Sequence, residues 1–226
     1  MATPRSKAGT KGVPRHHRRA QIQAAATEEF GTRGYAAASL AAIAERVGVT
    51  KTLLHQYFGT KEDLYLACLV PVGDRLLDTI RTAMGREGAT AHTPLRVLQS
   101  IFTALEGQRE AWFVLYDTSL PADGAAARRA AEYWSAIDAL AAGGTADLLR
   151  ATGSDDPLDA DALKYVWRDL VATLVRWWVK HPDESPDAMT RRCARLFAAA
   201  AALTPAPAEP AAQAEPDRRV PPPSRG

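Results

Sequence analysis

The sequence predicts an all-α protein in which a small three-helix head precedes a larger helical body. Apolar residues recur at three- and four-residue spacing in most segments, which is typical of amphipathic helices. No segment alternates apolar and polar residues as a half-buried strand does. Between residues 39 and 65, two short helical patterns flank a turn at Gly48, an order that predicts a helix-turn-helix. With 46% hydrophobic residues in 226, the chain can bury a sizeable core.

Composition divides the chain into four parts. We expect a disordered basic arm over residues 1–14, a helix-turn-helix head over 15–60, a helical body over 61–203 and a disordered tail over 204–226. The tail is rich in Pro, Ala and charge and lacks core-forming residues. The first 19 residues contain no acid, and their charge suits either contact with DNA phosphates or a solvated tail. The basic side chains there are Arg5, Lys7, Lys11, Arg15, Arg18 and Arg19, with His16 and His17.

The head begins with a helix predicted from Arg15 to Arg33, which Gly34-Tyr35 should end. Ser39 then serves as the N-cap of the first helix of the helix-turn-helix. Both helices turn an apolar face towards the core of the head. The residues on these faces are Ile22, Ala25, Ala26 and Phe30 in the first, and Leu40, Ile43, Ala44 and Val47 in the second.

Gly48 stands where the chain reverses, a position that favours positive φ. Thr50 is expected to cap the following helix, which runs from Lys51 to about Phe58 and turns Leu54 and Phe58 to the core. After it, Thr60-Lys61-Glu62-Asp63 has the form of a capping box that starts the next helix.

The outward side of the second helix carries side chains with a use in a DNA major groove. Gln bonds base edges, Leu and Thr touch thymine methyl groups, and Lys, His and Tyr reach phosphates. An ordinary helical hairpin without a DNA role is the alternative. The predicted DNA-binding residues are Ser39, Thr50, Lys51, Thr52, Leu53, His55, Gln56, Tyr57 and Lys61.

The run VGVTKTLLHQYFGTKEDLY, residues 47–65, resembles the DNA-binding signature of the tetracycline-repressor (TetR) family of bacterial regulators. The spacing of Ala25-Ala26, Phe30 and Gly34-Tyr35 fits the end of that family's first helix, so the resemblance covers roughly residues 15–70. It implies a three-helix head, a long fourth helix, and a larger helical domain that binds an effector and forms a dimer. Members are most often repressors.

The fourth helix is predicted from Lys61 to roughly Arg86, and Pro71 should kink it or split it in two. Further helices are expected to start near Pro94, Glu110, Pro121, Asp159 and Pro186. The last two are apolar over more than one face, which favours burial against both the core and a second subunit. The alternative is that they only fill the core. The predicted dimer contacts are Val166, Leu170, Leu174, Trp177, Leu196, Ala199 and Ala200.

Aromatic residues concentrate in the body, and aromatics with a few polar groups suit a small-molecule pocket between helices. Core packing alone explains such residues as well. The candidate ligand-binding residues are Trp112, Phe113, Tyr116, Tyr133, Trp134, Trp167 and Arg168.

Other classes of function have little support. The five histidines are remote from any Ser or Cys motif, and no nucleotide-binding or metalloprotease motif occurs, so we expect no catalytic residue, metal or cofactor. Cys68 and Cys193 are expected to be buried, reduced thiols. No apolar run is long enough to span a membrane, which indicates a cytoplasmic, nucleoid-associated protein.

The expected function is a ligand-responsive repressor binding a palindromic double-stranded DNA operator as a homodimer. The alternative is a DNA-binding regulator or architectural protein with no effector.

Overall fold

The computed structural model describes residues 14–85 and 92–202, and every regular element within these ranges is a helix. The expectation of an all-α fold is therefore confirmed. The predicted basic arm, apart from Pro14, and the predicted C-terminal tail lie outside the described residues. The helices are α1 (Arg15–Ala37), α2 (Leu40–Val47), α3 (Lys51–Phe58), α4 (Lys61–Gly85), α5 (Thr93–Ala104), α6 (Ala111–Leu115), α7 (Ala125–Ala151), α8 (Pro157–Val179) and α9 (Pro186–Ala202).

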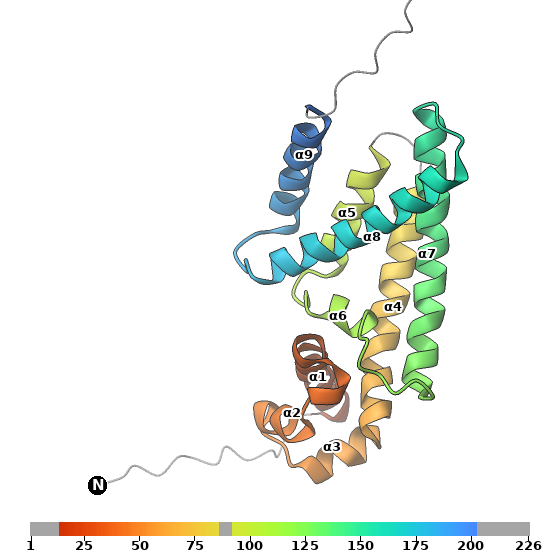
Figure 1. The fold of residues 1–226 in the computed structure, drawn as a ribbon. Coiled ribbons are helices and arrows are strands. Elements are labelled where there is room, and N and C mark those ends of the chain that lie inside the picture. The colour runs from red at the N-terminus through yellow and green to blue at the C-terminus, as the bar shows by residue number, and fades with distance from the viewer. Residues whose placement is uncertain (1–13, 86–91, 203–226) are drawn as a thin grey trace, which may run out of the picture.

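The molecule is elongated, with α1–α3 gathered at one end, α5, α8 and α9 towards the other, and α6 between them, next to α1 (Figure 1). We call α1–α3 the head and α4–α9 the body. Helix α4 leaves the head and runs beside α7 and α5, and α8 crosses in front of them (Figure 1). Helix α1 also packs on α4 and α6, so the head rests on the body through two elements.

The helix-turn-helix forms as its local residues predict. Ser39 Oγ accepts the N–H of Ala42 at 3.3 Å, and Gly48 ends α2 in the left-handed region with φ 68°. Thr50 Oγ1 accepts the N–H of Leu53 at 3.1 Å and caps α3. These contacts satisfy donors that a helix start leaves unpaired.

Helix α1 contains a break at Gly34, where φ is 73°, before its last residues. The break frees two backbone N–H groups, and the body supplies acceptors for both. Tyr35 N donates to Asp117 Oδ2 at 2.5 Å, and Ala36 N donates to Ser119 Oγ at 3.1 Å. The predicted end of the first helix at Gly34-Tyr35 is therefore a contact point between head and body.

Of the two outcomes predicted for Pro71, the split does not occur, because α4 runs without a break from Lys61 to Gly85. Proline has no N–H, and the carbonyl four residues earlier, that of Ala67, therefore loses its helical donor. Gln23 of α1 replaces it, with Nε2 donating to Ala67 O at 2.6 Å. A side chain of the head thus stabilises the proline-containing turn.

The helix predicted to start near Glu110 forms as α6, which is short and covers only Ala111–Leu115. Asp117 and Ser119 lie beyond its end, where they accept hydrogen bonds from the head instead. Likewise, α7 starts at Ala125 and not at Pro121.

The start of α4 forms the expected capping box. Asp63 Oδ2 accepts the Thr60 hydroxyl at 2.7 Å and the Thr60 N–H at 2.9 Å, and Asp63 N donates to Thr60 Oγ1 at 3.1 Å. The hydrogen bonds from Thr60 lower the pKa of the Asp63 carboxyl. Because the folded pKa lies below the unfolded one, the stabilisation is present above the unfolded pKa and is lost as pH falls through the folded pKa.

We expect Thr60→Ala to raise the pKa of Asp63 towards its usual value, since the hydroxyl is one of its two donors. An NMR pH titration of the Asp63 carboxyl measures this. Thr32→Ala, at an exposed position of α1, is the control and should leave the titration unchanged. An unaltered midpoint in Thr60→Ala would disprove the assignment of the shift to the capping box.

Candidate DNA-binding surface and body cavity

Helix α3 presents its polar side chains outwards and is held by two apolar residues. Leu54 is fully buried and Phe58 is 7% exposed, as the sequence predicts. On the other faces, Lys51, Thr52, His55 and Gln56 are exposed, while Leu53 and Tyr57 are half-buried. The exposed side chains can donate to and accept from groups on a partner, and the first turn adds unpaired backbone N–H groups that favour an anion.

Arginines at the start of α1 hold α3 in place, a role that the sequence did not reveal. Arg19 Nη1 donates to Tyr57 O at 2.8 Å, and its guanidinium lies 4.3 Å from the centre of the Phe58 ring. The guanidinium of Arg15 lies 5.5 Å from the ring centre of Tyr57. Arg15 and Arg19 are four residues apart, and a helix starting at Arg15 would have placed them on one face.

Four predicted DNA-binding residues already use their polar groups to hold the backbone around α3, and Thr50, the cap of α3, is one of them. The Ser39 hydroxyl caps α2, and Lys61 Nζ donates to Ala38 O at 2.8 Å while lying 4.9 Å from the Tyr35 ring centre. His55 Nδ1 lies 2.7 Å from Gly59 O. Each can still lie near DNA, but these contacts show that they first position the segments around α3.

A buried carboxylate, that of Glu29, fixes α2 on α1. Its side chain is 4% exposed and accepts the backbone N–H of Ser39 at 3.1 Å. Arg33 and Arg46 lie 3.3 Å and 3.8 Å from its oxygens. A buried charge needs such partners. The local sequence pattern does not predict that Glu29 is buried.

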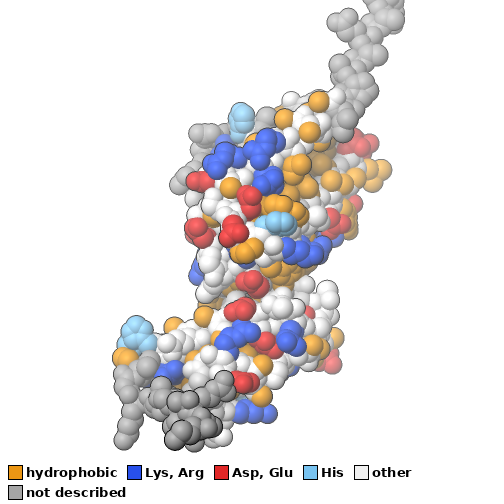
Figure 2. Space-filling view, turned by 90° about the vertical axis from the view of Figure 1, so that its left-hand side faces the viewer, with side chains coloured by type: hydrophobic (Ala, Val, Ile, Leu, Met, Phe, Trp, Pro, Cys, Tyr) orange, Lys and Arg blue, Asp and Glu red, His pale blue; other side chains and the backbone are white. Residues whose placement is uncertain are grey.

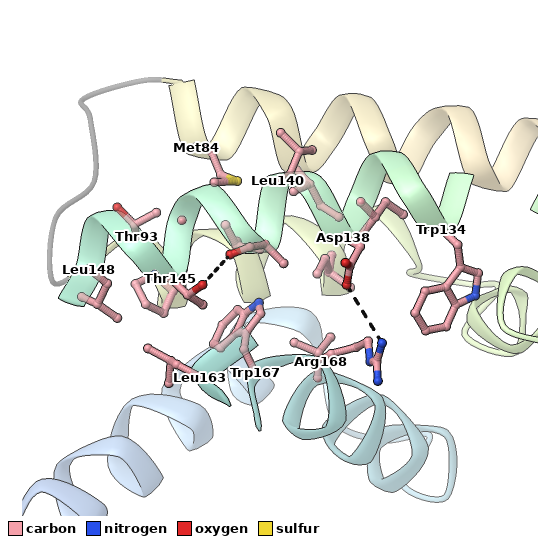
Figure 3. A pocket seen from close by; sticks show the side chains of 18 of the residues that line it. Met84, Thr93, Trp134, Asp138, Leu140, Thr145, Leu148, Leu163, Trp167 and Arg168 are labelled. Atoms are coloured by element: carbon pink, nitrogen blue, oxygen red, sulfur yellow. Dashed lines mark hydrogen bonds and ion pairs between the residues drawn. The ribbon is translucent and has the colours of Figure 1, made fainter. Parts of the chain in front are cut away.

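The body contains a cavity of about 110 Å³ between α4, α5, α7 and α8, with α6 at one end. Figure 3 shows its wall, which is mostly apolar. Of the seven candidate ligand-binding residues, five line it: Trp112, Tyr116, Trp134, Trp167 and Arg168.

Phe113 and Tyr133 are not part of the cavity wall. Each precedes or follows a lining residue by one position, and a one-residue step on a helix turns a side chain by about 100°. The Tyr133 ring packs on α4 at Gly73, where an added Cβ would lie 2.5 Å from it. Its hydroxyl lies 2.5 Å from Asp74 Oδ1 and 3.2 Å from Val70 O.

The outer faces of α8 and α9 expose several hydrophobic side chains. Val166 is 62% exposed and Leu196 51%, and Figure 2, which looks onto the α9 side, shows hydrophobic side chains among charged ones there. Of the other predicted dimer contacts, Ala199 and Ala200 are exposed and Leu170 and Trp177 half-buried. Leu174 is 7% exposed and belongs to the core of the single chain.

Cys68 and Cys193 are free and buried, as expected. Burial raises the pKa of the Cys68 thiol to about 12 and that of Cys193 to about 11. Within 14–85 and 92–202, no helix has the length and hydrophobicity that crossing a membrane requires.

Comparisons with known proteins agree with this geometry. The family model described as "Bacterial regulatory proteins, tetR family" matches residues 22–68. The HTH-type transcriptional activator FasR of Mycolicibacterium smegmatis is 33% identical over 105 residues, which are 46% of this chain and 48% of that protein. The regulator HbdR of Aromatoleum sp. is 34% identical over 113 residues, 47% of each. The chain thus spans about half the length of the curated relatives it matches.

Solved structures share the fold across most of the chain. A TetR-family regulator from Bordetella parapertussis has a TM-score of 0.65 at 22% identity and covers 79% of this chain and 93% of its own. The ketosteroid regulator KstR2 of Mycobacterium tuberculosis has a TM-score of 0.64 at 20% identity, with 80% and 92% covered. FadR from Bacillus subtilis, solved in complex with stearoyl-CoA, has a TM-score of 0.53 at 17% identity, with 76% and 95% covered.

Proposed function

The chain belongs to the TetR family of DNA-binding transcriptional regulators, and from that premise we propose that it is a ligand-responsive repressor binding a palindromic operator as a homodimer. The observation that carries this proposal is α3, whose Lys51, Thr52 and Gln56 are exposed on a helix that packs on α2 and α4 and accepts a hydrogen bond from α1. Such a protein acts in the cytoplasm, at the nucleoid.

Base reading is assigned to Gln56, Leu53 and Thr52, and phosphate contact to Lys51, Tyr57 and the start of α3. Ser39, Thr50, His55 and Lys61 hold the surrounding backbone and lie close enough to the same surface to add phosphate contacts. A dimer through the outer faces of α8 and α9 would cover Val166 and Leu196 and present two heads to two half-sites.

The effector is proposed to bind in the body cavity. Two sets of contacts connect this cavity to the head. Tyr116 lines the cavity, and its neighbour Asp117 accepts the N–H of Tyr35 in α1. Helix α4 lines the cavity through Ile80 and Met84 and accepts Gln23 of α1 at Ala67. A ligand that moves α6 or α4 would therefore change the position of α1, and with it that of α3.

A second candidate is an activator, because FasR is named as one. The same DNA-binding surface serves both signs of regulation, so a reporter assay must separate them. A further alternative is a DNA-binding regulator or architectural protein that has no small-molecule effector, and measurements of ligand binding test it.

The proposal is tested by selecting binding sites from randomised duplex DNA with the purified full chain. We expect an inverted repeat to be enriched, and its affinity to fall steeply with salt as counterions are released. Sedimentation should give two chains, or a multiple of two, on each site. Equal affinity for selected and scrambled duplexes would overturn the proposal.

Replacing Gln56 by alanine should alter sequence preference. We expect affinity for the selected duplex to fall roughly 5- to 100-fold, because one bidentate base contact contributes about 1–3 kcal/mol, with little change for scrambled DNA. Fluorescence anisotropy measures both. Gln99→Ala, at an exposed position of α5, is the matched control and should bind as the unaltered protein. By contrast, Lys61→Met should weaken binding to both duplexes alike.

A further inference from the structure

The polar side chains in one half of the cavity are already satisfied. Thr145 Oγ1 lies 3.0 Å from Ala141 O, which accepts its proton, and Thr93 Oγ1 accepts from Arg96 at 3.2 Å. Around them the wall consists of apolar side chains, among them Met84, Leu148 and Leu163 (Figure 3). This end of the cavity therefore suits only an apolar part of a ligand.

The opposite end, beside Trp134, holds two donors without a hydrogen-bond acceptor among the described residues: the Tyr116 hydroxyl and the Arg168 guanidinium. Arg168 has only distant charge contacts, 4.0 Å to Asp138 and 3.9 Å to Asp169, and lies 5.0 Å from the Trp134 ring centre. Burial raises the pKa of the Tyr116 hydroxyl. The positive charge of Arg168 lowers this pKa and the negative charge of Asp138 raises it, and both effects are smaller than that of burial. The hydroxyl is therefore protonated at neutral pH and able to donate.

Hydrogen-bonding capacity at this end favours an anion, because Arg168 and Tyr116 both present donors to the cavity. The carboxylate of Asp138 faces two cations, Lys164 at 3.5 Å and Arg168 at 4.0 Å. Lys164 is also paired with Asp161 at 3.0 Å, which leaves Arg168 as the cation with the weakest pairing. A guanidinium presents a planar fork of donors that matches a carboxylate.

The cavity is long as well as apolar. Its α7 wall extends from Trp134 to Leu148, which is about 21 Å along a helix that rises 1.5 Å per residue. Gly144 lies between these ends, and a Cβ there would be 2.9 Å from Met84 Cε. The missing side chain leaves room beside Met84 in the apolar half of the cavity, one helical turn before Leu148.

We infer that the effector is an elongated apolar molecule ending in a carboxylate, which Arg168 and Tyr116 bind while the apolar chain lies towards Leu148. This inference rests on the proposed function, because it names the ligand class of the proposed effector site. The bound carboxylate accepts from the Arg168 fork and from the Tyr116 hydroxyl, and the chain displaces water from the apolar half.

The test uses three probes of equal chain length: decanoate, decanamide and decylamine. Binding is followed by the fluorescence of the wall tryptophans, Trp112, Trp134 and Trp167, and confirmed by calorimetry. We expect decanoate to bind at least about tenfold more tightly than either analogue, the effect of one charge-assisted contact. Equal binding of the three probes, tighter binding of decylamine, or no binding of decanoate would overturn the inference.

Variants locate the two ends of the ligand. Arg168→Met should weaken the binding of decanoate about tenfold or more and leave the binding of decanamide nearly unchanged. Arg176→Met is the control, because Arg176 is exposed on the same helix, and it should alter the binding of neither probe. Gly144→Leu should abolish binding of every probe. Gly143→Leu is its control, because a Cβ there meets nothing within 4 Å. An Arg168→Met protein that keeps the preference for decanoate would contradict the assigned carboxylate site.

The failure of this inference is distinguishable from failure of the proposed function. Selection of an inverted repeat is measured without any ligand, and it depends on α3 and on the dimer but not on what the cavity binds. A chain that selects DNA but ignores decanoate retains its regulatory function and loses the assigned ligand class.

Discussion

Gly31→Ala should lower the free energy of unfolding by about 2–3 kcal/mol, or roughly 5–10 °C in Tm. An added Cβ at this position would lie 2.2 Å from the backbone oxygen of Glu110 and 2.7 Å from its carbonyl carbon. Backbone cannot rotate away as a side chain does, so α1 and the start of α6 must separate. Because α1 holds α3, DNA affinity should fall as well.

The control for Gly31→Ala is Gly143→Ala, an exposed mid-helix glycine with nothing within 4 Å of the added Cβ. Helix propensity alone favours alanine by about 1 kcal/mol, so the control should be slightly stabilised. Thermal and urea unfolding measure both variants. A Gly31→Ala protein as stable as the control would show that head and body do not meet as described.

Arg109→Met should lower the free energy of unfolding by about 3 kcal/mol or more. The Arg109 guanidinium donates to four carbonyls at the turn between α8 and α9: those of Trp178 at 3.0 Å, His181 at 2.9 Å, Pro182 at 2.9 Å and Glu184 at 2.8 Å. It also lies 4.0 Å from the Trp178 ring centre. Methionine keeps the apolar stem but supplies no donor.

Arg75→Met is the matched control, because the Arg75 guanidinium bonds one exposed carbonyl, that of Ala104, at 3.1 Å. It should change stability by less than about 1 kcal/mol. Since Arg109 holds the turn that leads from α8 into α9, the proposed dimer should also have a higher dissociation constant in Arg109→Met. Equal melting temperatures for the two variants would rule out the role assigned to Arg109.

Local signals predicted the helix-turn-helix well, since a cap or a turn depends on a few adjacent residues. Ser39, Gly48 and Thr50 take the predicted roles, and the capping box at Thr60 forms. Helical periodicity likewise predicted most of the body helices. It could not decide which of two neighbouring aromatics enters a cavity, as Tyr133 and Trp134 show.

Long-range polar contacts were beyond prediction, because their partners are remote in sequence and follow no period. The carbonyls that Arg109 binds follow it by 69 to 75 residues, and Asp117 follows Tyr35 by 82. The same holds for Gln23, whose bond to Ala67 explains how α4 continues through Pro71. The sequence showed that the proline removes a helical hydrogen bond. It did not show that the Gln23 side chain replaces that bond.

Photo-cross-linking from α3 to selected DNA tests the central claim most directly. A Gln56→Cys variant takes a thiol-reactive photo-cross-linker selectively, because Cys68 and Cys193 are buried with raised pKa values. Gln99→Cys carries the same group on the body as a control. The account predicts cross-links from position 56 to bases at fixed places in each half-site, and none from position 99. Absence of cross-links from position 56, or equal yields from both positions, would contradict it.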